Sequence, residues 1–372
     1  MPKRLIIAAA CARPFVQAAV RAGHEVIALD AFADADTTRA ARHCYRLDYA
    51  RGGFDAGELL QTLEELRSFE ADGFVYGSGF ERSPGLLEAV QGFVPVIGNR
   101  PQVLRRLKTP RRWFEMLDAL QIPYPPVRFS PPEHSAGWLM KSGGGSGGTH
   151  VRQCSRNAVQ DDAQDVYYQR EVRGEAVSLL FVAASGQAQV VGFNRQWTSP
   201  TPALPYRYGG AASRAVLADE VRARLASAAQ DIAREAGLSG FNSLDAIVTP
   251  DGVRVLEVNP RLSATFELYS DDRGELFDLH LATAAGVLLP LPSLAEQARA
   301  QHIVYAPQPL RVPLGMDWPV WTADLPHAGS VVSADAPLCS VIVEGGDAEQ
   351  ARAKALERER ELLAKLTSSS II

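Results

Sequence analysis

A hairpin signal near residue 250 constrains the fold of this 372-residue chain more than any other feature. Two strand-like segments, 244–249 and 253–258, flank three turn-forming residues that end in glycine, which predicts an antiparallel hairpin with a three-residue loop. Such a loop pairs residue 249 with residue 253 and, counting outward, Asp245 with Glu257. Because side chains alternate along a strand, Asn259 shares the face of Glu257. One face of one hairpin is therefore predicted to carry two carboxylates and an amide.

This set of oxygen donors is typical of a magnesium site. Carboxylate and amide oxygens are the hard ligands that Mg²⁺ prefers, and phosphate oxygens and water complete its octahedron. Pro260 stiffens the exit from the second strand, and Arg261 follows it within reach of a phosphate. An exposed hairpin with ordinary solvated acids is the alternative, and it is the better interpretation for either acid taken alone.

A glycine-rich segment at 143–148 forms a second candidate site. It contains five glycines and follows Lys141, which ends a strand-like stretch. Glycine permits positive φ and close backbone approach, so successive N–H groups can wrap phosphate oxygens while Lys141 adds a charge. The pattern G-x-G-x-x-G is present, but strand-like residues follow it, whereas a dinucleotide fingerprint needs a helix there. A plain linker is the alternative. The predicted phosphate contacts are Gly144, Gly145, Ser146, Gly147 and Gly148.

The first hundred residues alternate between strand and helix signals. Apolar runs at 5–10, 25–30 and 73–76 are separated by helix-like stretches, which predicts a small parallel sheet covered on both faces. The first turn, at 8–12, lacks the glycines that bring a pyrophosphate close to the backbone. An NAD-dependent oxidoreductase is therefore disfavoured.

Composition narrows the environment and the partners. The chain has 46% hydrophobic residues, a formal net charge of −5 and a pI near 5.9, so neither nucleic acid nor a membrane is an expected partner. Its four cysteines are scattered, which favours neither a zinc site nor a disulfide framework and fits a reducing cytoplasm. The N-terminal apolar run is too short for a typical signal peptide, so a cytoplasmic location is expected.

Taken in order, Lys108, the glycine segment and the acidic hairpin resemble the ATP-grasp superfamily over roughly residues 100–265. The resemblance implies that Lys108 and Lys141 hold the phosphates of ATP. It also implies two Mg²⁺ ions, with Mn²⁺ as a substitute, and catalytic roles for Arg261 and Lys141. The metal ligands that it implies are Asp245, Glu257 and Asn259.

The resemblance further places a nucleotide-binding hinge at 169–175. Gln169 and the backbone of Arg170, Glu171 and Val172 are expected to meet the adenine. The residue two places after Gly174, where an acid often binds the ribose in the superfamily, is an alanine. Glu175 is therefore the expected ribose ligand, and Glu171 is the alternative.

The expected architecture is an α/β chain with the ATP-grasp fold in three parts. Residues 1–98 form an N-terminal parallel α/β domain, and residues 99–290 form the ATP-grasp domain with a small β-rich lid at about 124–170. Residues 291–372 form a C-terminal β-rich extension with a terminal helix, giving an α+β portion. A homodimer is an open possibility for this extension.

Several phrases, including Ala12-Arg13-Pro14 and Tyr76-Gly-Ser-Gly-Phe-Glu81, look like a narrower branch of the superfamily. That branch includes the tyramine–glutamate ligase of methanofuran biosynthesis. The resemblance implies a ligase that joins a carboxylate, such as glutamate, to an amine, such as tyramine or tyrosine, through an acyl phosphate, releasing ADP and phosphate. The expected substrate-binding residues are Arg13, Glu81, Arg195 and Arg207.

Two other functions stay open from the sequence alone. One is a different ATP-grasp chemistry, namely a kinase or a carboxylase half-reaction. The other is a regulatory protein that binds ATP without turnover.

Overall fold

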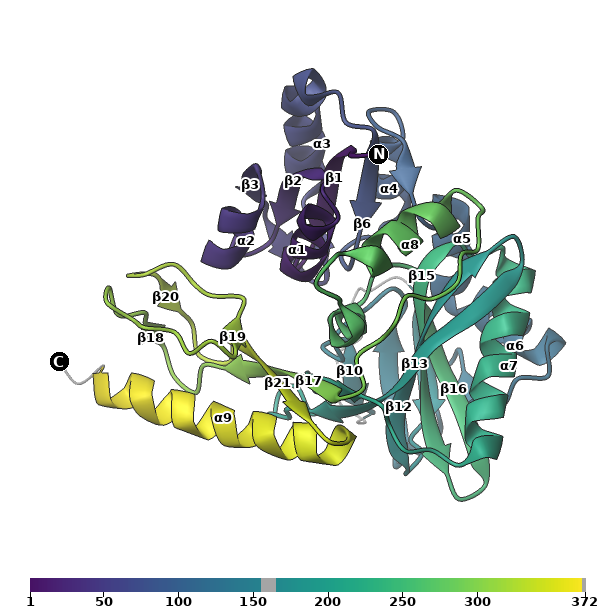
Figure 1. Cartoon of the computed structure of the whole chain (residues 1–372). Coiled ribbons are helices and arrows are strands. Elements are labelled where there is room, and N and C mark those ends of the chain that lie inside the picture. Colours follow the sequence, from purple (N-terminus) through teal and green to yellow (C-terminus); the bar gives the residue numbers. More distant parts are fainter. Residues whose placement is uncertain (155–164, 370–372) are drawn as a thin grey trace.

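The computed structural model describes residues 1–154 and 165–369, and Figure 1 shows how their sheets are arranged. The N-terminal unit stands above a long antiparallel sheet, which the C-terminal strands continue toward one side. A smaller four-stranded sheet is formed by residues within 127–170. No helix in the described ranges is long and apolar enough to cross a membrane.

The N-terminal unit is the predicted parallel sheet with helices on both faces. Its strand order is β3-β2-β1-β6-β7, and every neighbouring pair is parallel. Alternation along the first strand explains the two covered faces, because Leu5 and Ile7 enter one buried core and Ile6 and Ala8 enter another. The strands are β1 (Arg4–Ala9), β2 (Glu25–Asp30), β3 (His43–Arg46), β6 (Gly73–Tyr76) and β7 (Val96–Ile97). The helices are α1 (Arg13–Arg21), α2 (Ala35–Ala40), α3 (Ala56–Glu65) with η1 (Leu66–Phe69), and α4 (Pro84–Val90), and a short ribbon joins β4 (Tyr49–Ala50) to β5 (Gly53–Phe54).

The central sheet has eight antiparallel strands in the order β16-β15-β12-β13-β14-β17-β21-β19. β12 and β13 pair on either side of the turn at Ser185-Gly186. The expected division near residue 290 falls in a loop between α8 (Glu275–Ala284) and β17. Strands from before and after this loop nevertheless belong to one sheet, because Gly210 of β14 pairs with His302 of β17. The strands are β12 (Glu175–Ala184), β13 (Gln187–Thr198), β14 (Tyr208–Ser213), β15 (Gly240–Thr249), β16 (Gly252–Asn259), β17 (Ala298–Tyr305), β19 (Thr322–Ala323) and β21 (Pro337–Gly345).

The small sheet is built from residues within 124–170, the segment that was expected to form a lid, and 155–164 of that segment lie outside the described residues. Its strand order is β10-β9-β11-β8, and its neighbouring strands are antiparallel. The strands are β8 (Val127–Arg128), β9 (Trp138–Ser142), β10 (Val151–Gln153) and β11 (Val166–Arg170).

Two long helices pack against different parts of the central sheet. The long α7 (Asp219–Ala236) buries Leu225 and Ile232, which share one face at helical spacing, against β12, β13 and β15. It ends at Gly237, which adopts the left-handed conformation. α9 (Ala348–Ser369) lies along β17 and β21 in the C-terminal part (Figure 1). The remaining elements are α5 (Pro101–Lys108), α6 (Pro110–Ala119), η2 (Ala264–Tyr269), α8 (Glu275–Ala284), β18 (Leu310–Arg311) and β20 (Val331–Val332).

Candidate active site

The acidic hairpin is formed by β15 and β16, and its register corrects the prediction in one place. Thr249 pairs with Gly252, so the turn has two residues, and the expected pair of residues 249 and 253 is wrong. The register then shifts beyond Ala246, which leaves Leu256 as an extra residue in a β-bulge. The bulge restores the count, so Asp245 does pair with Glu257, as predicted.

Lys108, at the end of α5, reaches this hairpin. Its ammonium donates to Glu257 Oε2 at 2.8 Å and to the amide oxygen of Asn259 at 3.0 Å. The lysine is 149 residues from the glutamate in sequence and only 8% exposed. A cation therefore already lies among the oxygens that were predicted to hold Mg²⁺.

Asp245 completes the polar group on the hairpin face. Its two carboxylate oxygens accept from Asn259 Nδ2 at 3.0 Å and from Gln196 Nε2 at 3.2 Å. Burial and the charge of Glu257 raise the pKa of Asp245. Burial opposes ionisation of Glu257 too, but the neighbouring Lys108 ammonium lowers the pKa of that carboxyl. The two acids thus compete for positive charge, which a divalent cation would supply.

The donor chemistry of this hairpin fits Mg²⁺. No three His, Cys, Asp or Glu side chains gather into a metal-binding group in the described part of the chain. Here two carboxylates and one amide oxygen converge instead, and phosphate oxygens would have to complete the coordination. Asp245, Glu257 and Asn259 are the residues that would hold the metal.

The lid contributes a second lysine over the same region. Lys141 on β9 donates to Gln169 Oε1 on β11 at 2.6 Å. Burial lowers the pKa of Lys141 to about 8, although the charge of Glu257 acts in the opposite direction. Burial also lowers the pKa of His150, which follows the glycine segment, to about 4.

The glycine segment packs closely on two distant parts of the backbone. A Cβ on Gly144 would stand 2.5 Å from the carbonyl oxygen of Glu81, and one on Gly148 would stand 1.8 Å from that of Tyr206. Gly147 has the same left-handed conformation but nothing within 4 Å of its Cβ position. Glycine is therefore required at 144 and 148 by close approach as well as by φ.

Arg261 leaves the hairpin and meets Glu81 of the N-terminal unit. Its Nε donates to Glu81 Oε1 at 2.6 Å, and the other oxygen of Glu81 accepts the N–H groups of Gly79 and Phe80. Both side chains are almost fully buried, at 8% and 1% exposed. The charge of Arg261 keeps the pKa of Glu81 below its ordinary value despite burial. Glu81, expected to contact substrate, is thus placed where it orients Arg261.

The other expected substrate residues are engaged by protein groups. Arg13 is buried and makes a bidentate ion pair with Glu267 and a 2.6 Å contact with Asp324. Arg207 stacks on the ring of Tyr305, with 3.6 Å between guanidinium carbon and ring centroid. These arginines join parts of the fold in this structure.

The hinge carboxylates also have partners. Glu175 forms a 2.9 Å ion pair with Arg195, the fourth expected substrate residue, which also pairs with Glu349 of α9. Glu171 accepts from the hydroxyl of Tyr206 at 2.7 Å. The N–H groups of Arg170 and Glu171 donate to the carbonyl oxygens of Pro126 and Gly137.

Three buried polar atoms around this group have no hydrogen-bond partner among the described residues: His150 Nδ1, Gln169 Nε2 and the hydroxyl of Tyr208. Burial and the charge of Asp245 raise the pKa of the Tyr208 hydroxyl. Orphaned buried groups are costly unless a ligand satisfies them. These atoms therefore mark the region between lid and hairpin as a place for a polar ligand.

Gln196 and Tyr208 were not expected here. Strand alternation puts Gln196 on the same face of β13 as Asn194. Alternation alone does not say which other strands of the sheet carry side chains near that face. Tyr208 directly follows Arg207, and no spacing in the sequence distinguishes its hydroxyl from that of an ordinary core tyrosine.

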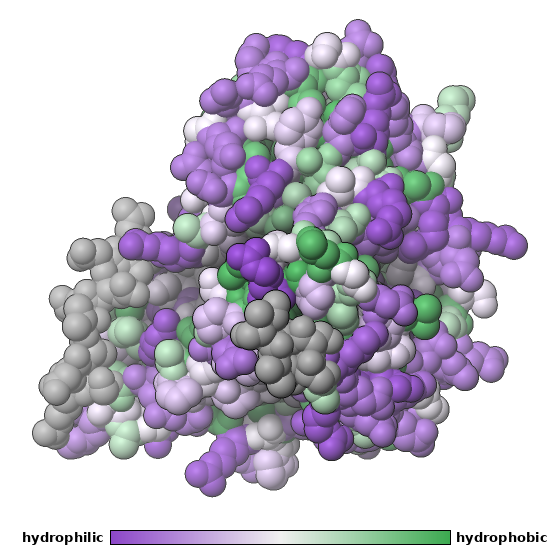
Figure 2. All heavy atoms as spheres, turned by 90° about the vertical axis from the view of Figure 1, so that its left-hand side faces the viewer, coloured by the Kyte–Doolittle hydropathy of each residue, from purple (hydrophilic) through white to green (hydrophobic). Residues whose placement is uncertain are grey.

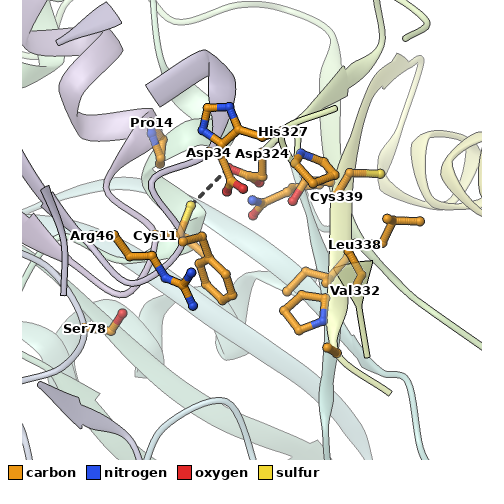
Figure 3. A pocket seen from close by; sticks show the side chains of 18 of the residues that line it. Cys11, Pro14, Asp34, Arg46, Ser78, Asp324, His327, Val332, Leu338 and Cys339 are labelled. Atoms are coloured by element: carbon orange, nitrogen blue, oxygen red, sulfur yellow. Dashed lines mark hydrogen bonds between the residues drawn. The ribbon is translucent and has the colours of Figure 1, made fainter. Parts of the chain in front are cut away.

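A cavity of about 460 Å³ adjoins Arg261, between the N-terminal unit and the C-terminal strands. Figure 3 shows its walls, with Cys11 and Pro14 on one side and Val332, Leu338 and Cys339 on the other. Figure 2 views the molecule from the side where these two units face each other, and hydrophobic side chains gather near the middle of a mainly hydrophilic face.

Comparisons with known proteins identify the fold that carries these residues. Residues 111–265 match the family model of the ATP-grasp domain. A search of the curated proteins gave no match. Among solved structures, the biotin carboxylase domain dimer of 2-oxoglutarate carboxylase from Hydrogenobacter thermophilus, in complex with MgADP, ADP and bicarbonate, has a TM-score of 0.74 at 14% identity, over 96% of this chain and 90% of that one.

Two further structures are similar over nearly their whole length. N5-carboxyaminoimidazole ribonucleotide synthetase from Thermotoga maritima has a TM-score of 0.67 at 14% identity, with 96% of this chain and 98% of that chain covered. L-amino acid ligase from Bacillus licheniformis has a TM-score of 0.67 at 14% identity, with 95% and 96% covered. The chain thus contains an ATP-grasp domain, and the expected α/β ATP-grasp fold is confirmed.

Proposed function

We propose that this ATP-grasp chain is an ATP-dependent ligase that joins a carboxylate to an amine through an acyl phosphate and releases ADP and phosphate. The observation that carries the proposal is the convergence of Lys108, Asp245, Glu257 and Asn259 beneath a glycine-rich lid that contributes Lys141. Phosphoryl transfer requires mostly positioning and charge neutralisation, so this site needs no protein nucleophile.

In the first step, an oxygen of the substrate carboxylate attacks the γ-phosphorus of ATP, and the bond to the β–γ bridging oxygen breaks. Lys141 and Lys108 would bind phosphate oxygens, and Arg261, held by Glu81, would stabilise the charge on the phosphoryl group in transit. Asp245, Glu257 and Asn259 would hold Mg²⁺, which would supply positive charge beside the phosphates. Lys108 would then exchange its contacts with Glu257 and Asn259 for phosphate.

In the second step, the amine attacks the acyl carbon, the carbon–oxygen bond to phosphate breaks, and the nitrogen loses a proton. Water would destroy the acyl phosphate before this step. The close packing of Gly144 on Glu81 and of Gly148 on Tyr206 supports a lid that closes without a gap at these points.

The finer assignment is part of the same proposal. Glutamate as the acid and tyramine or tyrosine as the amine are the first substrates to test. The proposed pathway is the biosynthesis of a methanofuran-type cofactor. The proposed protein is cytoplasmic and forms a homodimer. Hinge residues Gln169 to Val172 would bind the adenine. Glu175 would need to leave Arg195 before it bound the ribose, and Glu171 would need to leave Tyr206.

The test is ADP release from Mg-ATP with a pool of amino acids and amines that includes glutamate, tyrosine and tyramine. Each component is dropped in turn, and the mass of the product is measured. ADP that requires one acid and one amine, together with an amide product, is the expected result.

A carboxylase half-reaction is the second candidate, because the fold also occurs in biotin carboxylases. The same assay separates the two functions when bicarbonate is added or removed. ADP release that depends on bicarbonate and on no acid would replace the ligase proposal. Mg-ATP binding without ADP release under any condition would favour a regulatory protein.

A further inference from the structure

The cavity beside Arg261 lies where an open parallel sheet usually binds ligands. In the order β3-β2-β1-β6-β7 the chain turns in opposite directions from β1 and from β6, and Cys11 and Ser78 line the cavity just beyond the carboxyl ends of these strands. Such switch points form crevices in α/β sheets. A volume of about 460 Å³ is within the range of small-molecule sites.

Most of the wall is apolar. Phe15 and Phe32 come from the N-terminal unit, and Ile303, Val332 and Leu338 come from the C-terminal strands. These side chains suit an apolar ligand body, because burying apolar surface stabilises binding without requiring direction.

Three of the charged or titratable side chains in the wall are already satisfied. Arg261 pairs with Glu81, Asp324 accepts from Arg13 and Cys11, and the ring of His327 contacts the carbonyl of Ala33. They shape the cavity, but their strongest contacts are within the protein.

Two others, Asp34 and Arg46, have no side-chain hydrogen bond or ion pair within the described ranges. Asp34 precedes α2, where an aspartate usually caps the helix, yet its side chain makes no capping bond. Burial and then the charges of Asp324, Asp30 and Asp36 raise the pKa of Asp34 to about 8, so a cation beside it would restore its charge. Figure 3 shows the Arg46 guanidinium pointing into the cavity, and the carboxylates of Asp34 and Asp324 grouped on another part of its wall.

We propose that this cavity binds a zwitterionic amino acid with an apolar side chain, its ammonium on Asp34 and its carboxylate on Arg46. Asp34 is half-buried and Arg46 is exposed, and both line a largely apolar cavity without a side-chain partner among the described residues. These two opposite charges suit the two poles of such a molecule, and the apolar lining suits its body. The inference deepens the proposed function, on which it rests for the role of the amino acid as one of the two substrates.

The test is calorimetric binding to the full chain without ATP. The probes are L-phenylalanine, L-leucine, phenethylamine, which lacks the carboxylate, and 3-phenylpropionate, which lacks the amine. Asp34→Asn is expected to raise the Kd of phenylalanine and of phenethylamine at least tenfold. The Kd of 3-phenylpropionate should stay the same or fall. Arg46→Gln is expected to raise the Kd of phenylalanine and of 3-phenylpropionate and to leave the Kd of phenethylamine unchanged. Asp251→Asn and Arg112→Gln, both at exposed sites away from the cavity, are the matched controls.

The probe pattern separates recognition from damage to the fold. Equal losses for all probes in a variant, or failure of both amino acids to bind the folded wild-type chain, would overturn the proposal. So would phenethylamine binding as tightly as phenylalanine. Amino-acid binding with the expected pattern but no ADP release would reject the proposed function and leave this site standing. ADP release with other substrates and no amino-acid binding would do the reverse.

Discussion

The ammonium of Lys108 lies 2.8 Å from Glu257 Oε2, between the last turn of α5 and the second strand of the acidic hairpin. The same ammonium contacts the amide oxygen of Asn259. A positive charge thus offsets the carboxylates of the acidic hairpin. Because Mg-ATP brings both a cation and anionic oxygens, Lys108 and the hairpin can exchange partners without leaving any charge unpaired.

Replacing Glu257 with alanine tests this exchange. Turnover is expected to fall on the order of 10²-fold or more while ATP still binds weakly, because a group that stabilises the transferring phosphoryl is lost. ADP release and a Mg²⁺ titration measure the effect, and Asp251→Asn at the tip of the same hairpin is the control. Near wild-type turnover would refute the metal assignment.

Glu81→Gln is expected to affect catalysis through Arg261. Without its charged partner the guanidinium is less firmly placed, so kcat should fall roughly 10- to 100-fold while the Kd for ATP stays nearly constant. Steady-state kinetics and equilibrium ATP binding distinguish the two quantities. Glu88→Gln, which breaks the exposed pair with Arg105, is the matched control. A rise in the Kd for ATP without a fall in kcat would contradict a positioning role.

Two substitutions in the glycine segment separate close packing from backbone strain. Gly148→Ala places a Cβ 1.8 Å from the Tyr206 carbonyl, so the lid must shift and the KM for ATP should rise on the order of tenfold. Gly147→Ala has the same sign of φ and open space, so it should cost only about 1 kcal/mol of strain. Comparable KM values for the two variants would show that this contact does not position the lid.

Lys141 should make ATP binding depend on pH. Its pKa of about 8 means that the free protein loses this positive charge as the pH rises through 8, whereas bound phosphates favour the protonated form. Above pH 8 the Kd for ATP should therefore rise, by up to about tenfold per pH unit, with uptake of one proton on binding. Titration calorimetry in buffers of different ionisation enthalpy measures that proton. Lys141→Arg, which stays charged, should abolish the uptake.

His280 should make the fold sensitive to acid. It is 1% exposed, its Nδ1 accepts from the Phe241 N–H at 3.0 Å, and burial lowers its pKa to about 4. The unfolded chain protonates this histidine near its ordinary value of about 6.5, so the free energy of unfolding falls as the pH drops from 6.5 to 4, by up to about 3 kcal/mol.

Urea unfolding at pH 7 and pH 5 checks this expectation. His280→Asn keeps an acceptor for Phe241 and should remove about 2 kcal/mol of the pH dependence. His134→Asn, at an exposed position, should leave the dependence as in the wild type. An unchanged pH dependence in His280→Asn would mean that other groups cause the acid sensitivity.

The periodicity of apolar residues in the sequence predicted part of the fold. The apolar runs at 5–10, 25–30 and 73–76 predicted the parallel sheet that β1, β2 and β6 form. These patterns depend on 2.0- and 3.6-residue repeats, which any reader of the sequence can count. The same counting brought Asp245 opposite Glu257, although only a bulge at Leu256 compensated for the shorter turn.

The sequence by itself determined the types of group at the site: two lysines, two acids, an amide and a glycine-rich lid. The tertiary structure decided which of them touch. Arg13 is saturated by Glu267 and Asp324, which are more than 250 residues away, and Arg261 is held by Glu81 at a separation of 180 residues. Composition and spacing specify side-chain chemistry and local direction, but contacts across such distances arise only when buried apolar faces dock and fix the charged groups that they carry.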